Sequence, residues 1–167
     1  TPTLIMTTER PKNGLHIKYY FNFNPFSAPR IKFEINYKDG KIDGTRTQFY
    51  KNGQKQQEGN FKEGKEDGIR TQWHENGQKQ LEGNFKDDKE DGMLTEWHES
   101  GQKKLVGNYK NGKQDGKWTE WHRNVQIESE GSFKDGKADG KWTWWKQNGQ
   151  IEVERNYKDG ECISGDC

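Results

Sequence analysis

The sequence predicts an all-β protein, an elongated single-layer antiparallel sheet built from tandem 24-residue β-hairpins. Three observations predict this fold. Residue types recur every 24 positions, each unit has two runs of alternating apolar and polar residues, and turn-forming residues separate these runs. The composition agrees, because 26% hydrophobic residues are too few for a thick two-layer core. The 21 aromatic residues (7 Trp, 6 Tyr and 8 Phe) and 20 Gly are typical of thin sheets with many turns.

The 24-residue period is clearest in an Asp-Gly dipeptide, which first occurs at Asp43-Gly44 and last at Asp139-Gly140. Aromatic residues form two further columns of the repeat. The first column contains Phe49, Trp73, Trp97, Trp121 and Trp145, and the second contains Phe61, Phe85, Tyr109, Phe133 and Tyr157. Because a single hairpin is not stable alone in water, we predict that these aromatics are the scaffold that joins neighbouring units.

Each unit has the pattern of a hairpin. Residues 69–74 and 79–85 alternate in polarity, and Asn76-Gly77 between them predicts a turn, since both residue types tolerate positive φ. The Asp-rich segment 86–92 is expected to turn the chain into the next unit. Because the period is even, each column keeps its face of the sheet. We therefore expect the Trp, Thr, Phe/Tyr and Gly columns to share one common face.

The two ends of the chain differ from the array, which spans residues 31–160. Residues 1–30 contain all four prolines and are expected to form a divergent segment and cap, with a first strand at residues 19–23. Residues 161–167 are expected to be a tail. Near that end Arg155 replaces the Gly column, and its large side chain should close the array.

The only two cysteines, Cys162 and Cys167, lie in this tail. Their spacing is compatible with a small disulfide loop, which would indicate an oxidising compartment, and equally with two free surface thiols. A secreted, periplasmic or surface-attached location is slightly favoured over the cytoplasm. No stretch approaches the roughly 20 apolar residues that span a membrane.

The unit Asp-Gly-x-x-Thr-x-Trp-His-x-Asn-Gly-Gln, followed by Glu-Gly-x-Phe-Lys-Asp-Gly-Lys, resembles the MORN-repeat variant found in bacteria, a family often described as antitoxins. The resemblance covers residues 31–160 and implies successive hairpins without catalysis. More distant eukaryotic MORN repeats are associated with membrane lipids and protein assembly. One unit departs from the pattern at Asn124-Val125. Since Val resists positive φ, this turn should change type or carry strain.

The face opposite the expected scaffold becomes apolar along the array. It is polar near Arg46 and Arg70, and its later apolar residues are Leu94, Val106, Trp118, Trp142 and Trp144. Their shared even numbering predicts one surface that a single layer leaves exposed. We interpret it as the partner-binding surface, because Trp is enriched in binding hot spots. The alternative is that the tail or a second copy of the chain covers it.

Other columns favour structural roles. Equivalent histidines, such as His74 and His98, are two strands apart, roughly 9–10 Å, which is too far to share a zinc ion. One Asp per loop is too few for calcium. No nucleophile and base converge, so we predict a non-enzyme without a metal or other cofactor. A net charge of +1 without a basic patch argues against nucleic-acid binding.

The sequence therefore favours a non-catalytic scaffold for protein–protein interaction, with a partner that could be a toxin if the chain is an antitoxin or immunity-type protein. A lipid- or envelope-surface module is the first alternative, because Lys117 and Lys141 flank the Trp residues. A self-associating structural repeat is the second.

Overall fold

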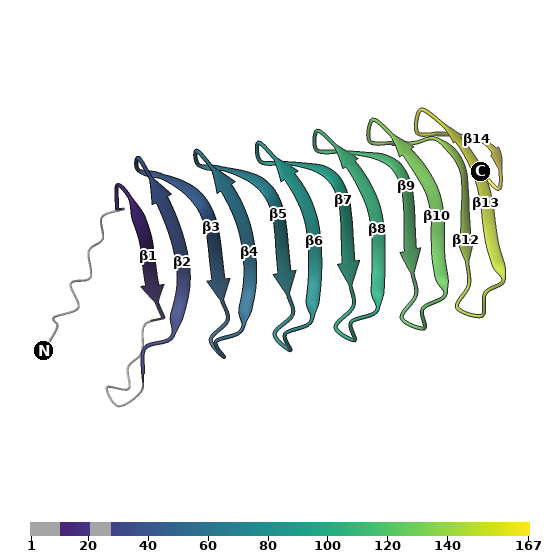
Figure 1. The fold of residues 1–167 in the computed structure, drawn as a ribbon. Coiled ribbons are helices and arrows are strands. Elements are labelled where there is room, and N and C mark those ends of the chain that lie inside the picture. The colour runs from purple at the N-terminus through teal and green to yellow at the C-terminus, as the bar shows by residue number, and fades with distance from the viewer. Residues whose placement is uncertain (1–10, 21–27) are drawn as a thin grey trace, which may run out of the picture.

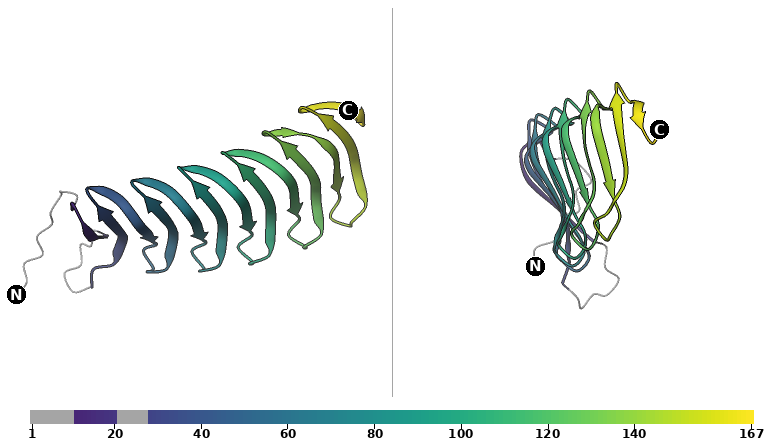
Figure 2. Two further views of the ribbon diagram at one scale, coloured as in Figure 1. Left: turned by 45° about the horizontal axis from the view of Figure 1, so that its top comes forward. Right: turned by 90° about the vertical axis from the view of Figure 1, so that its right-hand side faces the viewer.

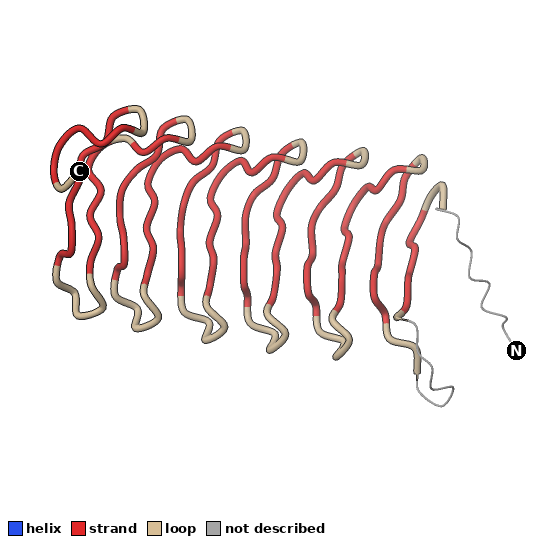
Figure 3. Tube along the Cα trace, turned by 180° about the vertical axis from the view of Figure 1, so that it is seen from behind, coloured by secondary structure: helices blue, strands red, loops and turns tan. Residues whose placement is uncertain are grey.

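A computed structural model describes residues 11–20 and 28–167, and these form a single antiparallel sheet with no helix in the described ranges (Figures 1 and 3). The strands are β1 (Gly14–Tyr19), β2 (Ile31–Lys38), β3 (Lys41–Phe49), β4 (Lys55–Lys62), β5 (Lys65–Trp73), β6 (Lys79–Lys86), β7 (Lys89–Trp97), β8 (Lys103–Lys110), β9 (Lys113–Trp121), β10 (Ile127–Lys134), β11 (Lys137–Ala138), β12 (Gly140–Trp145), β13 (Ile151–Lys158) and β14 (Glu161–Gly165). They pair in chain order, except that the short β11 pairs only with β10. The predicted single-layer sheet of tandem hairpins is confirmed.

The hairpins stand side by side along one axis, with β1 and β14 at opposite ends (Figure 1). Viewed along that axis, the strands nearly superimpose in a thin, curved profile (Figure 2). The main contacts of each strand are with the strands directly before and after it. The stability of such an array is therefore close to a sum over neighbouring hairpins.

Two kinds of turn connect the strands, one kind at each end of the strands. The β6–β7 turn is Asp87-Asp88, with φ of 51° and 66°. The equivalent turns elsewhere have Asp, Glu or Asn at the first position and Gly at the second, and φ is positive at both. Positive φ at both positions is the type I′ geometry that matches strand twist. The segment predicted to turn the chain at residues 86–92 thus turns only at these two residues.

The turns at the other end of the strands contain the Asn-Gly dipeptide in three units, and Ser100-Gly101 or Asn124-Val125 in the other two. The backbone N–H of Gly77 donates to the His74 carbonyl (2.9 Å), and the N–H of Gln78 donates to Asn76 Oδ1 (3.0 Å). Only Gly77 of the dipeptide has positive φ, at 86°. Val125 occupies the equivalent position with φ of 63°. The turn thus keeps its geometry with a β-branched residue at positive φ, and the strain expected at Val125 is confirmed.

Four of the five Asp-Gly dipeptides, from Asp43-Gly44 to Asp115-Gly116, lie within strands and not in loops, which corrects the expected turn. In the fifth, Asp139 separates β11 from β12. Gly92 has φ of 119° inside β7, beside a register shift between Gly83 and Phe85 of β6. A glycine accommodates the extra residue of such a β-bulge without strain. The aspartate of the first dipeptide stabilises a neighbouring turn, since Asp43 Oδ2 accepts the backbone N–H of Glu63 (3.1 Å).

The ends also differ from expectation. The first strand, β1, begins at Gly14 and ends at Tyr19, and residues 21–23 of the predicted strand lie outside the described residues. The predicted tail is the edge strand β14, and a disulfide joins Cys162 to Cys167. Arg155 Nε donates to the Asp166 carbonyl (2.7 Å), so this side chain does close the array.

Candidate functional site

The two faces of the sheet carry different columns of the repeat. We call the face with Trp118 and Trp142 the ladder face, and the face with the Thr column, such as Thr71, the threonine face. The Gly and Phe/Tyr columns lie on the ladder face, since Gly107 pairs with Trp118. The Thr column and the column Phe49, Trp73, Trp97, Trp121 and Trp145 lie on the other. The predicted common face is wrong, because the regular cross-strand pairs, such as Gly83 with Arg70 and Gly107 with Trp118, join an odd-numbered residue to an even-numbered one.

Aromatic rings on the ladder face form a continuous series across β8 to β12. Ring centroids are 5.7 Å apart for Tyr109 and Trp118, 5.4 Å for Trp118 and Phe133, 5.0 Å for Phe133 and Trp142, and 5.7 Å for Trp142 and Trp144. Edge-to-face and offset contacts at these distances are favourable. Trp118 and Trp142 are each only 6% exposed. Within one sheet layer, neighbouring side chains already bury these rings.

The predicted partner-binding surface is therefore corrected in two respects. Leu94, at 7% exposure, packs with Trp118 and Trp142 in the core cluster, so these three residues are not an exposed patch. Trp144 is only half-buried and packs beside them. Val106 pairs with Thr95 and lies on the threonine face. Val106 has an even number, as Leu94 does, but it lies in the second strand of its hairpin, where even-numbered residues face the other side.

The N-terminal half of the ladder face carries arginines where the C-terminal half has tryptophans, but it is not wholly polar, since Phe85 is buried there. The guanidinium of Arg70 lies 5.3 Å from the Phe85 ring centroid and 3.6 Å from Glu66 Oε2. The Nε atom of Arg70 is buried without a hydrogen-bond partner. Burial raises the pKa of Glu66, and the Arg70 charge opposes this shift. Arginine, leucine and tryptophan thus occupy successive positions of one column on this face.

The threonine face carries a repeated polar set and, beside it, exposed apolar residues. The Thr71 hydroxyl donates to Glu82 Oε2 (3.3 Å), and Lys79 Nζ lies 2.5 Å from the same oxygen. Exposed apolar side chains of this face include Leu15 at the N-terminal end and, within the array, Ile69, Met93, Ile127 and Ile151. These residues were not among those predicted from the sequence. The available signal was the lysine column, which changes to isoleucine at residues 127 and 151.

The histidine column joins neighbouring units. Nε2 of His74 lies 3.1 Å from the Trp97 carbonyl, and Nε2 of His122 lies 2.7 Å from the Trp145 carbonyl. Tyr50 makes the same contact with the Trp73 carbonyl (2.7 Å). No group of three potential metal-ligating side chains occurs in residues 11–20 and 28–167. Nor does the described part contain a helix long and apolar enough to cross a membrane.

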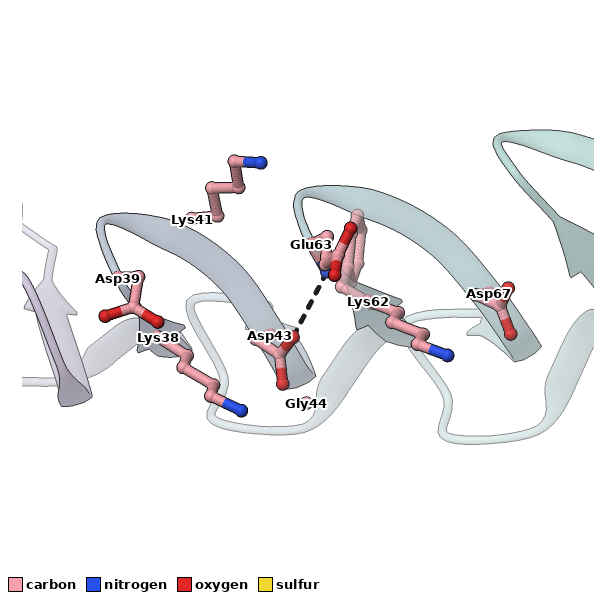
Figure 4. A pocket seen from close by; sticks show the side chains of 9 residues that line it. Lys38, Asp39, Lys41, Asp43, Gly44, Lys62, Glu63 and Asp67 are labelled. Atoms are coloured by element: carbon pink, nitrogen blue, oxygen red, sulfur yellow. Dashed lines mark hydrogen bonds between the residues drawn. The ribbon is translucent and has the colours of Figure 1, made fainter.

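An open hollow between the type I′ turns has a charged lining (Figure 4). Lysine and carboxylate side chains alternate around it, and the Asp43 carboxylate already accepts the backbone N–H of Glu63. Its lining residues are Lys38, Asp39, Lys41, Asp43, Gly44, Phe61, Lys62, Glu63 and Asp67. Charges of both signs in a repeated position are typical of a solvated surface.

The hairpins coincide with the units of a known repeat. A family model described as the MORN repeat variant matches residues 42–63, 66–87, 90–111, 114–135 and 138–159. The chain belongs to the MORN repeat variant family. Each MORN match spans nearly one hairpin, such as β5 with β6, and ends in the type I′ turn. MORN repeats are generally non-catalytic and act as scaffolds that often bind other molecules. No curated protein is significantly similar to the chain.

Proposed function

We propose that this MORN array is a non-catalytic scaffold that binds another protein. Exposed apolar residues on the threonine face, two of which line one hollow, are the observation that most supports this function. Ile69 is 53% exposed, Met93 60%, Ile127 37% and Ile151 56%. Apolar side chains grouped on an open sheet face are typical of a binding surface. A single-layer sheet also offers a long, rigid surface for one partner.

The partner class follows from the resemblance to the bacterial variant. We propose an antitoxin or immunity-type role, in which the array binds a toxin protein. The disulfide between Cys162 and Cys167 supports an oxidising location, such as the periplasm or the outside of the cell.

Affinity capture followed by reconstitution tests this function. The chain, immobilised with its disulfide intact, should retain one protein from its source cells. The two purified proteins should then form a complex of fixed stoichiometry in size-exclusion chromatography with light scattering. If no retained protein forms such a complex when purified, the proposed function fails.

Binding to a lipid surface is a second candidate, because lysines lie beside two of these exposed apolar residues. Lys103 and Lys117 line the same hollow as Met93 and Ile127. Basic residues beside exposed apolar ones suit an anionic membrane surface. Co-sedimentation with vesicles of phosphatidylglycerol and phosphatidylcholine would support this candidate, and retention in the supernatant would exclude it. Light scattering of the chain alone tests self-association.

A further inference from the structure

Four hairpins carry a similar polar set on the threonine face. The lysine of the set stands three residues before the glutamate in the first two hairpins, and two residues before the threonine in the last two. In each of them a threonine hydroxyl donates to a glutamate, and a lysine ammonium pairs with that glutamate. The four sets are Thr47, Glu58 and Lys55; Thr71, Glu82 and Lys79; Thr119, Glu130 and Lys117; and Thr143, Glu154 and Lys141. The repeated carboxylate therefore satisfies one hydroxyl and one cation in every set.

The β7–β8 hairpin lacks this carboxylate. Val106 occupies the glutamate position, opposite Thr95. In the described part of the chain, the Thr95 hydroxyl has no hydrogen-bond partner and the Lys103 ammonium has no ion pair. Lys79 is the residue that corresponds to Lys103. Its ammonium pairs with Glu82 and lies 5.6 Å from the Trp97 ring centroid. The valine side chain ends at its Cγ atoms and does not reach the position of the glutamate carboxylate. That position is therefore open to solvent.

A hollow lies beside Val106. Met93, Val106, Trp121 and Ile127 line it, and Lys103 lies at the same opening. Lys117 also lines it but is paired with Glu130 Oε2 at 3.0 Å. The hollow thus combines an apolar floor with one unpaired cation, Lys103, beside the Lys117–Glu130 ion pair, whose two charges offset each other. A lipid surface is usually held by several cations, whereas one ammonium and one hydroxyl match one carboxylate.

We infer that this hollow binds an acidic side chain of a partner protein, flanked by apolar residues on an extended segment. The partner's carboxylate pairs with Lys103 at the opening of the hollow. It lies beside Val106 and its cross-strand neighbour Thr95, where the other four hairpins have a glutamate. Its apolar neighbours contact Met93 and Ile127. This inference rests on the proposed function, since it specifies the chemistry of the protein partner.

Selection from a displayed library of random heptapeptides tests the inference without a known partner. The disulfide-bonded full chain is the bait, and Val106→Glu is the matched control because it restores the residue of the four other hairpins. Val106→Thr keeps the shape of the hollow and adds no carboxylate. Circular dichroism and thermal unfolding should show that both variants fold.

The wild type should enrich peptides with Asp or Glu beside an apolar residue. Replacing that Glu by Gln in the synthetic peptide should weaken binding by about fivefold or more. Val106→Glu should abolish binding, and Val106→Thr should retain it. The inference is overturned if no peptide is enriched, if enriched peptides lack an acid, or if Val106→Glu binds them equally.

Three further results distinguish this inference from the proposed function. A reconstituted partner that binds wild type and Val106→Glu equally overturns the site but leaves the scaffold function standing. Self-association that Val106→Glu abolishes would assign the hollow to a second copy and overturn the inference. Vesicle binding that Val106→Glu abolishes would assign the hollow to lipid, with the same consequence.

Discussion

The indole ring of Trp118 lies over the backbone of Gly107 on the neighbouring strand, so closely that a Cβ atom at residue 107 would overlap the ring. Trp142 has the same relationship with Gly131. A strand glycine often marks such a close approach of another group. This relationship explains how a single-layer sheet buries two large indoles without a second layer.

Substituting Gly107→Ala should therefore destabilise the protein, because the methyl group must displace the Trp118 ring. Overpacking of this kind typically costs about 1–3 kcal/mol. Gly83→Ala is the matched control, since a Cβ there would meet Leu94 at an ordinary 3.5 Å. Urea unfolding should show a loss for Gly107→Ala and little change for Gly83→Ala. Equal free energies of unfolding for the two variants would refute the close approach.

Val125→Gly should stabilise the protein, because Val125 is a β-branched residue at φ of 63°. Relief of a left-handed conformation is worth about 1–2 kcal/mol, and the added flexibility of glycine offsets roughly half of it. Val125→Ala, which keeps a Cβ atom, should gain much less. Thermal unfolding compares the three proteins, and an equal gain for Ala would show that backbone strain is not the cause.

Glu66→Gln should alter the pH dependence of stability. Burial raises the pKa of Glu66 above 4.5, so the folded protein holds this proton at pH values where the unfolded chain has released it. The free energy of unfolding of the wild type should thus increase, relative to Glu66→Gln, as the pH falls from 7 towards 4.5. Urea unfolding across this range measures the difference. A constant difference, or one of opposite sign, would contradict the assignment.

Loss of the Cys162–Cys167 disulfide should loosen β14 alone. Closing so short a loop is worth about 2 kcal/mol, which acts on the edge strand. In Cys162→Ser/Cys167→Ser, amide hydrogen exchange should accelerate in β14 and in the β13 residues that pair with it. Exchange in β7 should not change, because stability depends on neighbouring hairpins. Accelerated exchange throughout the array would disprove this local role.

The fold could be predicted because the 24-residue period appears in several columns at once, each with its own physical reason. The placement of residues on faces could not be predicted from number parity. A turn changes which parity faces which side, and the pairing of Gly107 with Trp118 follows from the turn length and the bulges. For the same reason Val106 was assigned to the wrong face.

The burial of Trp118 was also beyond sequence reasoning. It depends on Gly107 and on aromatic rings from two adjacent strands, and only the register brings these residues together. Val106 and Ile127 both interrupt their columns, which the sequence alone makes visible. Their shared hollow could be found only after the strands were paired.

Site-specific photo-crosslinking tests most directly whether the array binds a partner protein through its threonine face. Benzoylphenylalanine replaces either Met93, on that face, or Lys104, which is exposed beside Leu81 on the ladder face. Both variants are illuminated in an extract of the source cells and again with the purified partner. We predict that residue 93 crosslinks to one protein and residue 104 does not. Crosslinking from residue 104 alone, from both residues equally, or from neither would contradict the account.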